Sequence, residues 1–295
     1  MAVAVNLTDS KPIFVRNVPG VRSGYDYVGI VQKVGDKVGK THDVGDRIAG
    51  LIHGANVYNL EDGAFAEYAN AKPEVSMKVP DNLSNEEAAS LGVGVTTVGQ
   101  GLYKSLGLPL PYSGSKWEGE PILIWGGSTA TGVLGIQYAK ASGLNVIATS
   151  SLHNFDYLRS LGADAVFDYR SPTAASDIKT YTQNLLRYAW DCTGQGAQQC
   201  AAAMSDKLLG KYGNIVPVDQ NVLHQTNPQV RGPFWTLGYD AFGEDARYGD
   251  MIRPASPDEL EFSKMFWELS RQLFADGTVK PIRVNINRHG AGLED

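Results

Sequence analysis

Glycines and hydroxyl side chains follow a short apolar run in the middle of the chain. Residues 121–135 read PILIWGGSTATGVLG, which predicts a buried strand over Pro121–Trp125, then a turn, then a helix. Glycines permit a tight turn and close phosphate approach, and the N–H groups and dipole of a helix start favour an anion. Ser128, Thr129 and Thr131 add hydroxyl donors. The segment predicts a phosphate-binding turn; because the strict GxGxxG spacing is absent, a purely structural glycine turn stays the alternative.

The end of the next expected strand bears on which dinucleotide such a turn would bind. Enzymes that use NAD usually place a carboxylate there for the ribose 2′-hydroxyl. This chain instead has TSSLHN at 149–154, with no acid. Ser151, His153 and Asn154 are short polar donors suited to a 2′-phosphate, which predicts NADPH. A helix cap is the plain alternative for Asn154.

The elements that must position these residues alternate along the chain. Apolar runs over 121–125, 145–149, 165–169, 187–191 and 213–218 predict strands, and helical patterns lie between them. This alternation predicts an α/β fold with a doubly wound parallel sheet, a Rossmann domain. Short segments with frequent glycines over 26–71 predict a small β-rich domain. Residues 219–256 are rich in Pro, Gly and aromatics and are expected to form a loop, and a helix is expected over 259–276.

Bulk composition excludes several classes of function. The chain has 295 residues, 43% of them hydrophobic, and a net charge of -6, so a general nucleic-acid or anionic-membrane binder is not expected. No apolar run is long enough for a membrane span and no signal peptide is evident, which predicts a cytoplasmic protein. Two cysteines and five scattered histidines offer no zinc-ligand pattern, so no metal is expected.

Several segments together resemble one family. They read AVAVNLTDSK, YDYVGIVQKVG, VGDRIAG, GAFAEY, KVPDNLSNEEAASL, WGGSTATG and ATSSLHNFDYLRSLGADAVFDYR. The chain resembles the zinc-free medium-chain dehydrogenase/reductases, and most closely the trans-acting enoyl reductases of fungal polyketide synthases. Zinc-dependent relatives carry a GHE motif where this chain has Gly24-Tyr25-Asp26, and their four-cysteine lobe is missing here.

The resemblance implies a fold and a division of the chain. It implies a GroES-like catalytic domain with a Rossmann domain inserted, which we place as 1–83 GroES-like, 84–222 Rossmann, and 223–295 a substrate-facing loop, a helix and a partial return to the catalytic domain. Family members begin earlier, with further strands, and end differently after Val284. The chain is therefore expected to be truncated at both ends.

The resemblance also implies site residues. The expected cofactor contacts are Thr8, Asp9, Ser10, Lys11, Ser128, Thr129, Ala130, Thr131, Ser151, Leu152, His153, Asn154, Tyr169, Val218 and Asp219. The expected acyl-facing wall consists of Val95, Thr96, Thr97, Val98, Gly99, Gln100, Gly101 and Leu102, together with Gly238, Tyr239, Asp240, Ala241 and Phe242. Lys11 is the expected catalytic residue, and no metal ligand is implied. For Thr97 and Phe242, an ordinary helix or core role is the alternative.

The implied chemistry is NADPH-dependent reduction of the double bond of an α,β-unsaturated polyketide thioester in secondary metabolism. The implied partner is the acyl carrier protein of a polyketide synthase, and a monomer is expected. Two alternatives stay open at this point: a free-standing quinone or alkenal reductase, and a catalytically silent NADPH-binding or interaction protein.

Overall fold

A computed structural model describes residues 2–10, 19–36, 38, 41–114, 117–248 and 250–286. The chain forms two compact units, of which one consists of Met1–Thr96, Tyr239–Gly277 and Pro281–Asp295 and the other of Thr97–Gly238 and Thr278–Lys280. The finer domain boundaries expected from the sequence stay a prediction. We call the first the small-sheet unit and the second the Rossmann unit.

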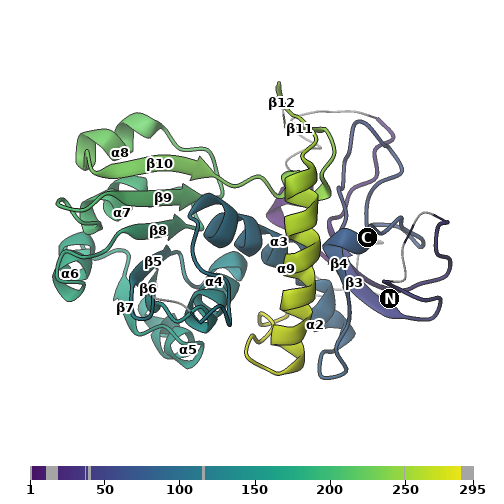
Figure 1. The fold of residues 1–295 in the computed structure, drawn as a ribbon, viewed down its shortest axis with the longest axis horizontal. Helices are drawn as coiled ribbons and strands as arrows, with labels where there is room; N and C mark the ends of the chain where they lie inside the picture. The colour runs from purple at the N-terminus through teal and green to yellow at the C-terminus, as the bar shows by residue number, and fades with distance from the viewer. Residues whose placement is uncertain are drawn as a thin grey trace. The chain divides into compact units, whose positions relative to one another are not determined.

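The Rossmann unit is built on a parallel sheet of six strands in the order β10-β9-β8-β5-β6-β7 (Figure 1). Its strands are β5 (Pro121–Trp125), β6 (Asn145–Ser150), β7 (Ala165–Asp168), β8 (Tyr188–Asp191), β9 (Gly210–Asn214) and β10 (Val230–Trp235). Chain order reverses beside β5, which is the doubly wound topology expected from the sequence. Leu123, Ile147 and Ala189 are fully buried along three of these strands, which explains their unbroken apolar runs.

Helices and short turns connect these strands. They are α4 (Ala130–Ala141), η3 (Leu152–Asn154), α5 (Phe155–Ser160), α6 (Ala174–Tyr181), α7 (Ala197–Ala203), α8 (Gln220–Thr226) and, before β5, the π-helix η2 (Gly99–Ser105). Gly101 and Gly135 face Trp190, and a Cβ on either would lie 2.5 or 2.6 Å from the indole. Small residues at these two positions therefore let η2 and α4 pack closely on the fully buried Trp190.

The expectation of a loop over 219–256 is wrong. This segment contains α8, the sheet strand β10, a 3-10 turn η4 (Gly238–Phe242) and the hairpin of β11 (Ala246–Tyr248) and β12 (Met251–Arg253). Strand β10 contains Gly232 and Pro233, and its pairing with β9 shifts register between Arg231 and Phe234. A glycine and a proline inside a strand hide the apolar pattern, and both are tolerated because β10 lies at the sheet edge.

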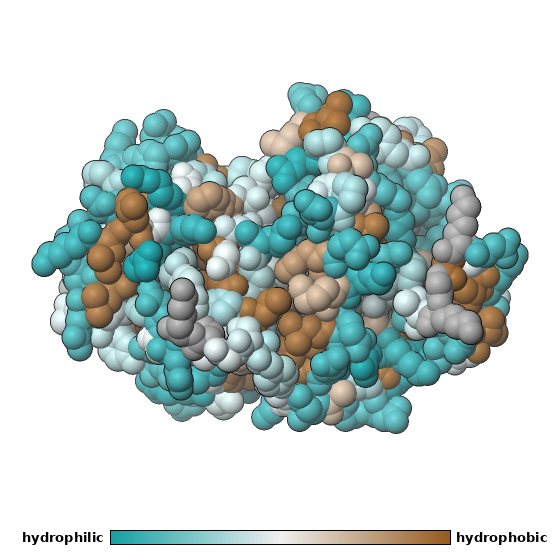
Figure 2. All heavy atoms as spheres, viewed as in Figure 1, coloured by the Kyte–Doolittle hydropathy of each residue, from teal (hydrophilic) through white to brown (hydrophobic). Residues whose placement is uncertain are grey.

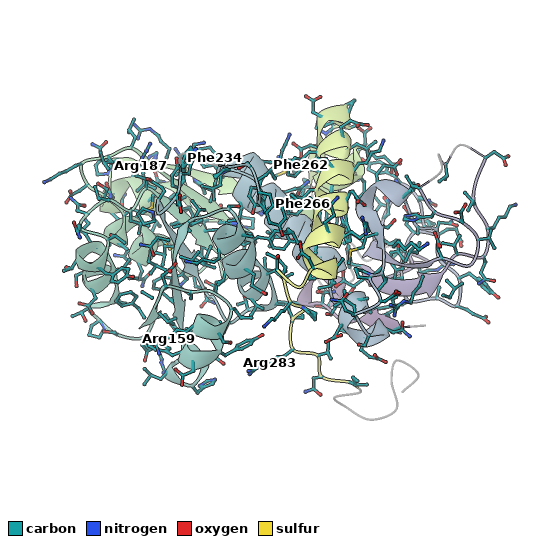
Figure 3. All side chains as sticks on the ribbon, turned by 60° about the horizontal axis from the view of Figure 1, so that its bottom comes forward. Arg159, Arg187, Phe234, Phe262, Phe266 and Arg283 are labelled. Atoms are coloured by element: carbon teal, nitrogen blue, oxygen red, sulfur yellow. The ribbon has the colours of Figure 1, made fainter. Side chains whose placement is uncertain are left out.

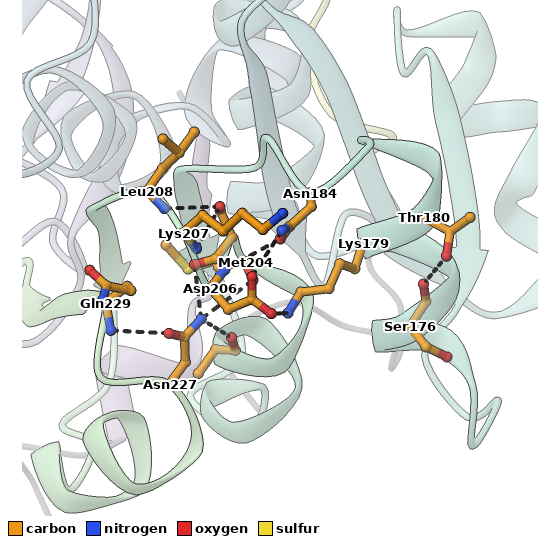
Figure 4. Close-up of polar contacts among 12 residues, drawn as sticks. Ser176, Lys179, Thr180, Asn184, Met204, Asp206, Lys207, Leu208, Asn227 and Gln229 are labelled. Atoms are coloured by element: carbon orange, nitrogen blue, oxygen red, sulfur yellow. Dashed lines mark hydrogen bonds and ion pairs between the residues drawn. The ribbon is translucent and has the colours of Figure 1, made fainter.

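Polar contacts fix the connections among α6, α7 and α8 (Figure 4). The Asn227 amide donates to the backbone oxygens of Ala201 and Ser205 at 3.0 and 3.1 Å, and its oxygen accepts from the Gln229 amide at 3.0 Å. Asp206 accepts hydrogen bonds from Lys179 and Asn184. Each of these groups is satisfied within the chain, so this part of the unit serves the fold.

The small-sheet unit contains a four-stranded antiparallel sheet in the order β1-β2-β3-β4. Its strands are β1 (Ala2–Ala4), β2 (Asp26–Ile30), β3 (Arg47–Leu51) and β4 (Ser76–Lys78), and a 3-10 turn η1 (Pro73–Val75) precedes β4. Tyr27, Ile48, Ile52 and Ala64 form a buried cluster beside this sheet. The sheet confirms the β-rich domain expected from the sequence.

Three helices complete this unit. Helix α2 (Asn85–Ala89) begins at Ser84, whose side chain forms a capping box with Glu87. Helix α3 (Gly92–Val98) follows, and α9 (Pro257–Ala275) begins at a Ser256 cap. On α9, Phe262 and Phe266 project from the same side and stack with ring centroids 5.7 Å apart (Figure 3).

The surface mixes polar and apolar side chains. On the face shown in Figure 2, hydrophilic side chains cover most of the molecule and apolar patches lie between them. Among the residues that the structure describes, no helix is both long and apolar enough to cross a membrane.

Candidate functional site

The glycine turn after β5 has the backbone that a phosphate-binding turn requires. Gly126 has a φ of +79°, and a Cβ there would lie 2.4 Å from the Thr193 methyl. A Cβ on Gly132 would lie 2.4 Å from the Gly126 backbone oxygen. The glycines therefore serve both the tight turn and the close contact between the turn and helix α4.

Hydrogen bonds hold the turn in place before any ligand binds. The Thr129 hydroxyl donates to the Gly126 oxygen at 2.8 Å and accepts from the Gly132 amide at 3.0 Å, so Thr129 is the N-cap of α4. The Gly126 amide donates to the hydroxyl of Thr149 on β6 at 3.0 Å. The Gly127 amide donates to the backbone oxygen of the same residue at 2.8 Å. The Thr129 hydroxyl therefore shapes the turn and the phosphate donors must come from elsewhere.

Those donors lie just beyond the cap. Ala130 and Thr131 are the first two residues of α4, where backbone N–H groups have no partner within the helix. Ser128 and Ala130 are exposed and Thr131 is half-buried. An exposed, preformed turn at the start of a twelve-residue helix fits a dinucleotide pyrophosphate.

The expected adenosine-side residues lie at the ends of the two neighbouring strands. Ser150 on β6 pairs with Asp168 on β7, so the segment that starts at Ser151 and the one that starts at Tyr169 leave the sheet side by side. Ser151 and Asn154 are half-buried, whereas Leu152 and His153 are exposed. Tyr169 is 46% exposed at this edge.

An acid also ends β7, but it is already paired. Arg170 contacts both carboxylate oxygens of Asp168 at 3.0 and 3.1 Å, and these bonds lower the pKa of Asp168 below its usual value. The same guanidinium lies 5.7 Å from the centre of the Tyr169 ring. Arg159 on α5 pairs with Asp156 and points into solvent (Figure 3). Arg159 and Arg170 therefore lie on the segments that directly follow Asn154 and Asp168.

Asp191 ends β8, at the carboxyl ends of the parallel strands. It has a structural role there that sequence reasoning missed. It is fully buried, and its carboxylate accepts five hydrogen bonds. These come from the amides of Thr193, Gly194 and Gly196 and from the hydroxyls of Thr193 and Tyr212, at 2.7 to 3.0 Å. Asp191 therefore fixes the loop between β8 and α7. The text DCTGQG directly after an apolar strand is the sequence signal that could have revealed it.

The remaining cofactor candidates of the Rossmann unit lie after β9. The Asp219 side chain accepts from the Asn221 amide at 2.9 Å and caps α8, while Val218 is half-buried beside the sheet core. Asp219 thus has a structural role in the chain, and a cofactor contact for either residue stays a prediction.

In the small-sheet unit the structure describes Thr8, Asp9 and Ser10, while Lys11 lies outside the described residues. Thr8 and Ser10 are half-buried and Asp9 is buried. One Asp9 carboxylate oxygen accepts from the Asn6 amide at 2.5 Å, so this side chain is turned into the protein.

Asp26 occupies the acid position of the zinc relatives' motif and is also buried. It accepts from the Asn6 side chain at 3.0 Å and from the Val93 amide at 2.6 Å. Burial is the largest cause that raises the pKa of Asp26 to about 7, and nearby Asp9 adds to it. Burial likewise raises the pKa of Asp9 to about 6.

The expected acyl-facing residues of 95–102 are mostly core. Val95, Val98 and Leu102 are fully buried, and Thr96 and Gln100 are nearly so, whereas Thr97 is half-buried. Gly101 is accounted for by its contact with Trp190. Thr97 is therefore the member of this group with the best access to a ligand.

The second expected acyl-facing segment, the turn η4, is anchored by aromatic stacking. The rings of Tyr239 and Phe242 stack on the His53 ring, and their centroids lie 4.4 and 5.4 Å from the His53 centroid. The Tyr239 hydroxyl forms a hydrogen bond with the Tyr25 hydroxyl at 2.8 Å. Asp240 pairs with Arg253 of β12. Tyr239, Ala241 and Phe242 are buried, whereas Gly238 and Asp240 are half-buried.

Metal and thiol chemistry have little basis in the described residues. No group of three or more His, Cys, Asp or Glu side chains is close enough to hold a metal ion in the part of the chain that the structure describes. Cys192 and Cys200 are free and buried, and burial raises the pKa of both thiols.

Comparisons with known proteins agree with this geometry. The family described as zinc-binding dehydrogenase matches residues 130–236. The fold is similar to that of CurK enoyl reductase, with a TM-score of 0.71 at 20% identity over 94% of this chain and 76% of that one. An alcohol dehydrogenase superfamily protein from Novosphingobium aromaticivorans gives a TM-score of 0.73 at 20% identity over 95% of this chain and 78% of that one. The fold is thus that of the medium-chain dehydrogenase/reductases.

Sequence relatives define the family more narrowly. Trans-enoyl reductase ACTTS2 of Alternaria alternata is 42% identical over all of this chain and 85% of that protein. Trans-enoyl reductase TOXD of Cochliobolus carbonum is 46% identical over 90% of this chain and 88% of that protein. The chain belongs to the trans-enoyl reductase family, oxidoreductases that act on carbon–carbon double bonds, and its fold class implies a nicotinamide cofactor.

Proposed function

We propose that this protein uses NADPH to reduce the α,β-double bond of a polyketide thioester carried by the acyl carrier protein of a polyketide synthase. The observation that carries the proposal is the phosphate-binding turn at the end of β5, beside an acid-free segment at the end of β6, in a chain of the trans-enoyl reductase family. We assign this activity to secondary metabolism and the protein to the cytoplasm.

Residues of the Rossmann unit bind and orient the cofactor. The exposed amides that begin α4, with the Ser128 and Thr131 hydroxyls, bind the pyrophosphate. Ser151, His153 and Asn154 bind the 2′-phosphate. Asp168 does not repel that phosphate because Arg170 neutralises it. Bound NADPH supplies a hydride.

Residues of the small-sheet unit act on the thioester. Charge develops on the thioester oxygen when hydride adds at the β-carbon, so a cation or donor near that oxygen lowers the barrier. We assign this role to Lys11 because the resemblance to the family implies it. Thr97, of the Rossmann unit, and the half-buried Gly238 and Asp240 of η4 contact the acyl chain.

Substrate choice tests the proposal. Stopped-flow oxidation of NADPH should be fast with crotonyl thioesters, faster with the carrier-bound form than with the free one, and slow with quinones. The opposite order would identify a free-standing quinone or alkenal reductase. NADPH binding without oxidation by any substrate would identify a silent binding protein.

Lys11→Ala tests the catalytic assignment. Loss of a cation near the developing oxyanion should slow single-turnover hydride transfer roughly ten- to a thousandfold, or about 1.4–4 kcal/mol. NADPH affinity should change much less, and Lys11→Arg should restore part of the rate. Lys33→Ala, at an exposed lysine of the same unit, is the matched control. A Lys11→Ala rate within twofold of the parent would remove Lys11 from the mechanism.

A further inference from the structure

Asp26 links two segments that are far apart in the sequence. Its Oδ2 accepts from the Asn6 side chain at 3.0 Å, and Asn6 begins the segment that leads to Lys11. Its Oδ1 accepts from the Val93 amide at 2.6 Å, in the first turn of α3, which leads to Thr97. One buried carboxylate therefore joins the chain segments that carry the expected catalytic lysine and the expected acyl contact.

The surroundings of Asp26 leave this carboxylate no room to move. A Cβ on Gly92 would lie 2.5 Å from Asp26 Oδ1 and 2.3 Å from the Gly50 oxygen, so α3 begins directly against the strand. Ala4 of β1 pairs with Asp26 in the sheet register, which brings the Asn6 segment alongside. Asp26 is 1% exposed, so water cannot substitute for its partners.

Asp9 places a second carboxyl group in the same cluster. Asp9 accepts a hydrogen bond from the backbone N–H of Asn6, and the side-chain NH2 of Asn6 donates to Asp26. A single asparagine therefore bridges the two acids. Asp9 Oδ1 is buried and has no hydrogen-bond partner within the described residues. Asp9 is the titratable group that acts on Asp26 among those described, and backbone amides and Asn6 provide the other contacts.

We propose that Asp26 is a positioning residue that holds residues 6–10 and the first turn of α3 in one arrangement, with a proton retained between Asp26 and Asp9. Two buried like charges repel, so one carboxyl group keeps a proton at neutral pH. Loss of that proton drives Asp9 away from Asp26 and loosens both attached segments. In agreement, burial raises the pKa of Asp26 to about 7 and that of Asp9 to about 6.

Hydrogen exchange tests this without any turnover. In the parent protein, protection of peptides covering 2–10 and 91–98 should fall together, about tenfold or more, between about pH 6 and pH 8.5, after correction for intrinsic rates. Asp26→Asn keeps the shape and removes the charge, so protection of both peptides should become independent of pH. Asn6→Ala should loosen only the first peptide. Asp62→Asn, at a buried acid held by Asn56 and Asn59, should behave as the parent.

Hydride transfer provides the second measurement and rests on the proposed function. The parent rate should fall above neutral pH, and Asp26→Asn should abolish that fall. If the parent oxidises no NADPH with any thioester, the proposed function fails while the exchange experiment still decides the role of Asp26. Parent protection that does not change with pH, or an Asp26→Asn profile like that of the parent, would overturn the inference.

Discussion

Two buried aspartates end or begin strands in the two units, and they differ in how their charge is met. Asp191 accepts five hydrogen bonds, three of them from amides of the loop that follows it and two from hydroxyls. Asp26 accepts two and lies near a second buried acid. A carboxylate surrounded by donors is a fixed structural acceptor, whereas one with few donors and a like-charged neighbour can change protonation near neutral pH. Burial alone does not distinguish these roles.

Asp191→Asn should produce the largest effect. An amide in place of the carboxylate would turn an NH2 group toward donors and leave buried N–H groups unpaired. We expect a loss on the order of 3 kcal/mol or more in the free energy of unfolding, measured by urea denaturation. Asp26→Asn at neutral pH should cost far less, because the Val93 amide can still donate to the new amide oxygen and a flipped Asn6 side chain can accept from the new NH2 group. Equal losses would remove the distinction between the two acids.

Gly92→Ala should destabilise the small-sheet unit by a smaller amount. The added methyl would contact backbone at 2.3 Å as well as the Asp26 carboxylate, so α3 must shift. Overpacking of this kind costs about 1–3 kcal/mol. Gly29→Ala, where nothing lies within 4 Å of a Cβ, is the matched control in the same unit. Thermal unfolding of both variants measures the difference, and an unshifted Gly92→Ala transition would contradict the close packing.

The dependence of the unfolding free energy on pH should reveal the raised pKa of Asp26. Because the pKa of Asp26 is raised when the protein folds, its stabilising contribution is present below its unfolded value near 4 and is lost as pH rises through about 7. Relative to the parent, Asp26→Asn should therefore gain up to about 1.4 kcal/mol in unfolding free energy per pH unit across that range. Denaturation of the parent and of Asp26→Asn at several pH values measures this difference.

Ser151→Asp places an acid directly after β6, at the carboxyl ends of the parallel strands of the Rossmann unit. Stability should change little because position 151 is half-buried and next to an exposed segment. Cofactor preference should invert, since a carboxylate would repel the 2′-phosphate. The parent should bind NADPH at least about tenfold more tightly than NADH, about 1.4 kcal/mol. Equal affinities in the parent, by fluorescence titration, would refute this account of the edge.

The same two aspartates show how far the sequence could predict this molecule. The parallel sheet and the turn at 126–132 depend on local patterns, and the structure confirms both. Strand β10 escaped prediction because Gly232 and Pro233 interrupt its pattern. The motif that contains Asp26 was visible, but its link to Asn6 and Val93 depends on contacts between distant segments, which no local pattern encodes. The five donors of Asp191 include Tyr212, on another strand, for the same reason.

Isotope transfer tests the central claim, reduction of a carbon–carbon double bond by NADPH, most directly. The protein is incubated with crotonyl thioester and with NADPH that carries deuterium at both C4 positions, and the product is analysed by mass spectrometry and NMR. We predict one deuterium at the β-carbon of the saturated thioester and, in a parallel reaction in heavy water, one at the α-carbon. A saturated product without deuterium at the β-carbon, or deuterium on a reduced carbonyl carbon instead, would contradict the account.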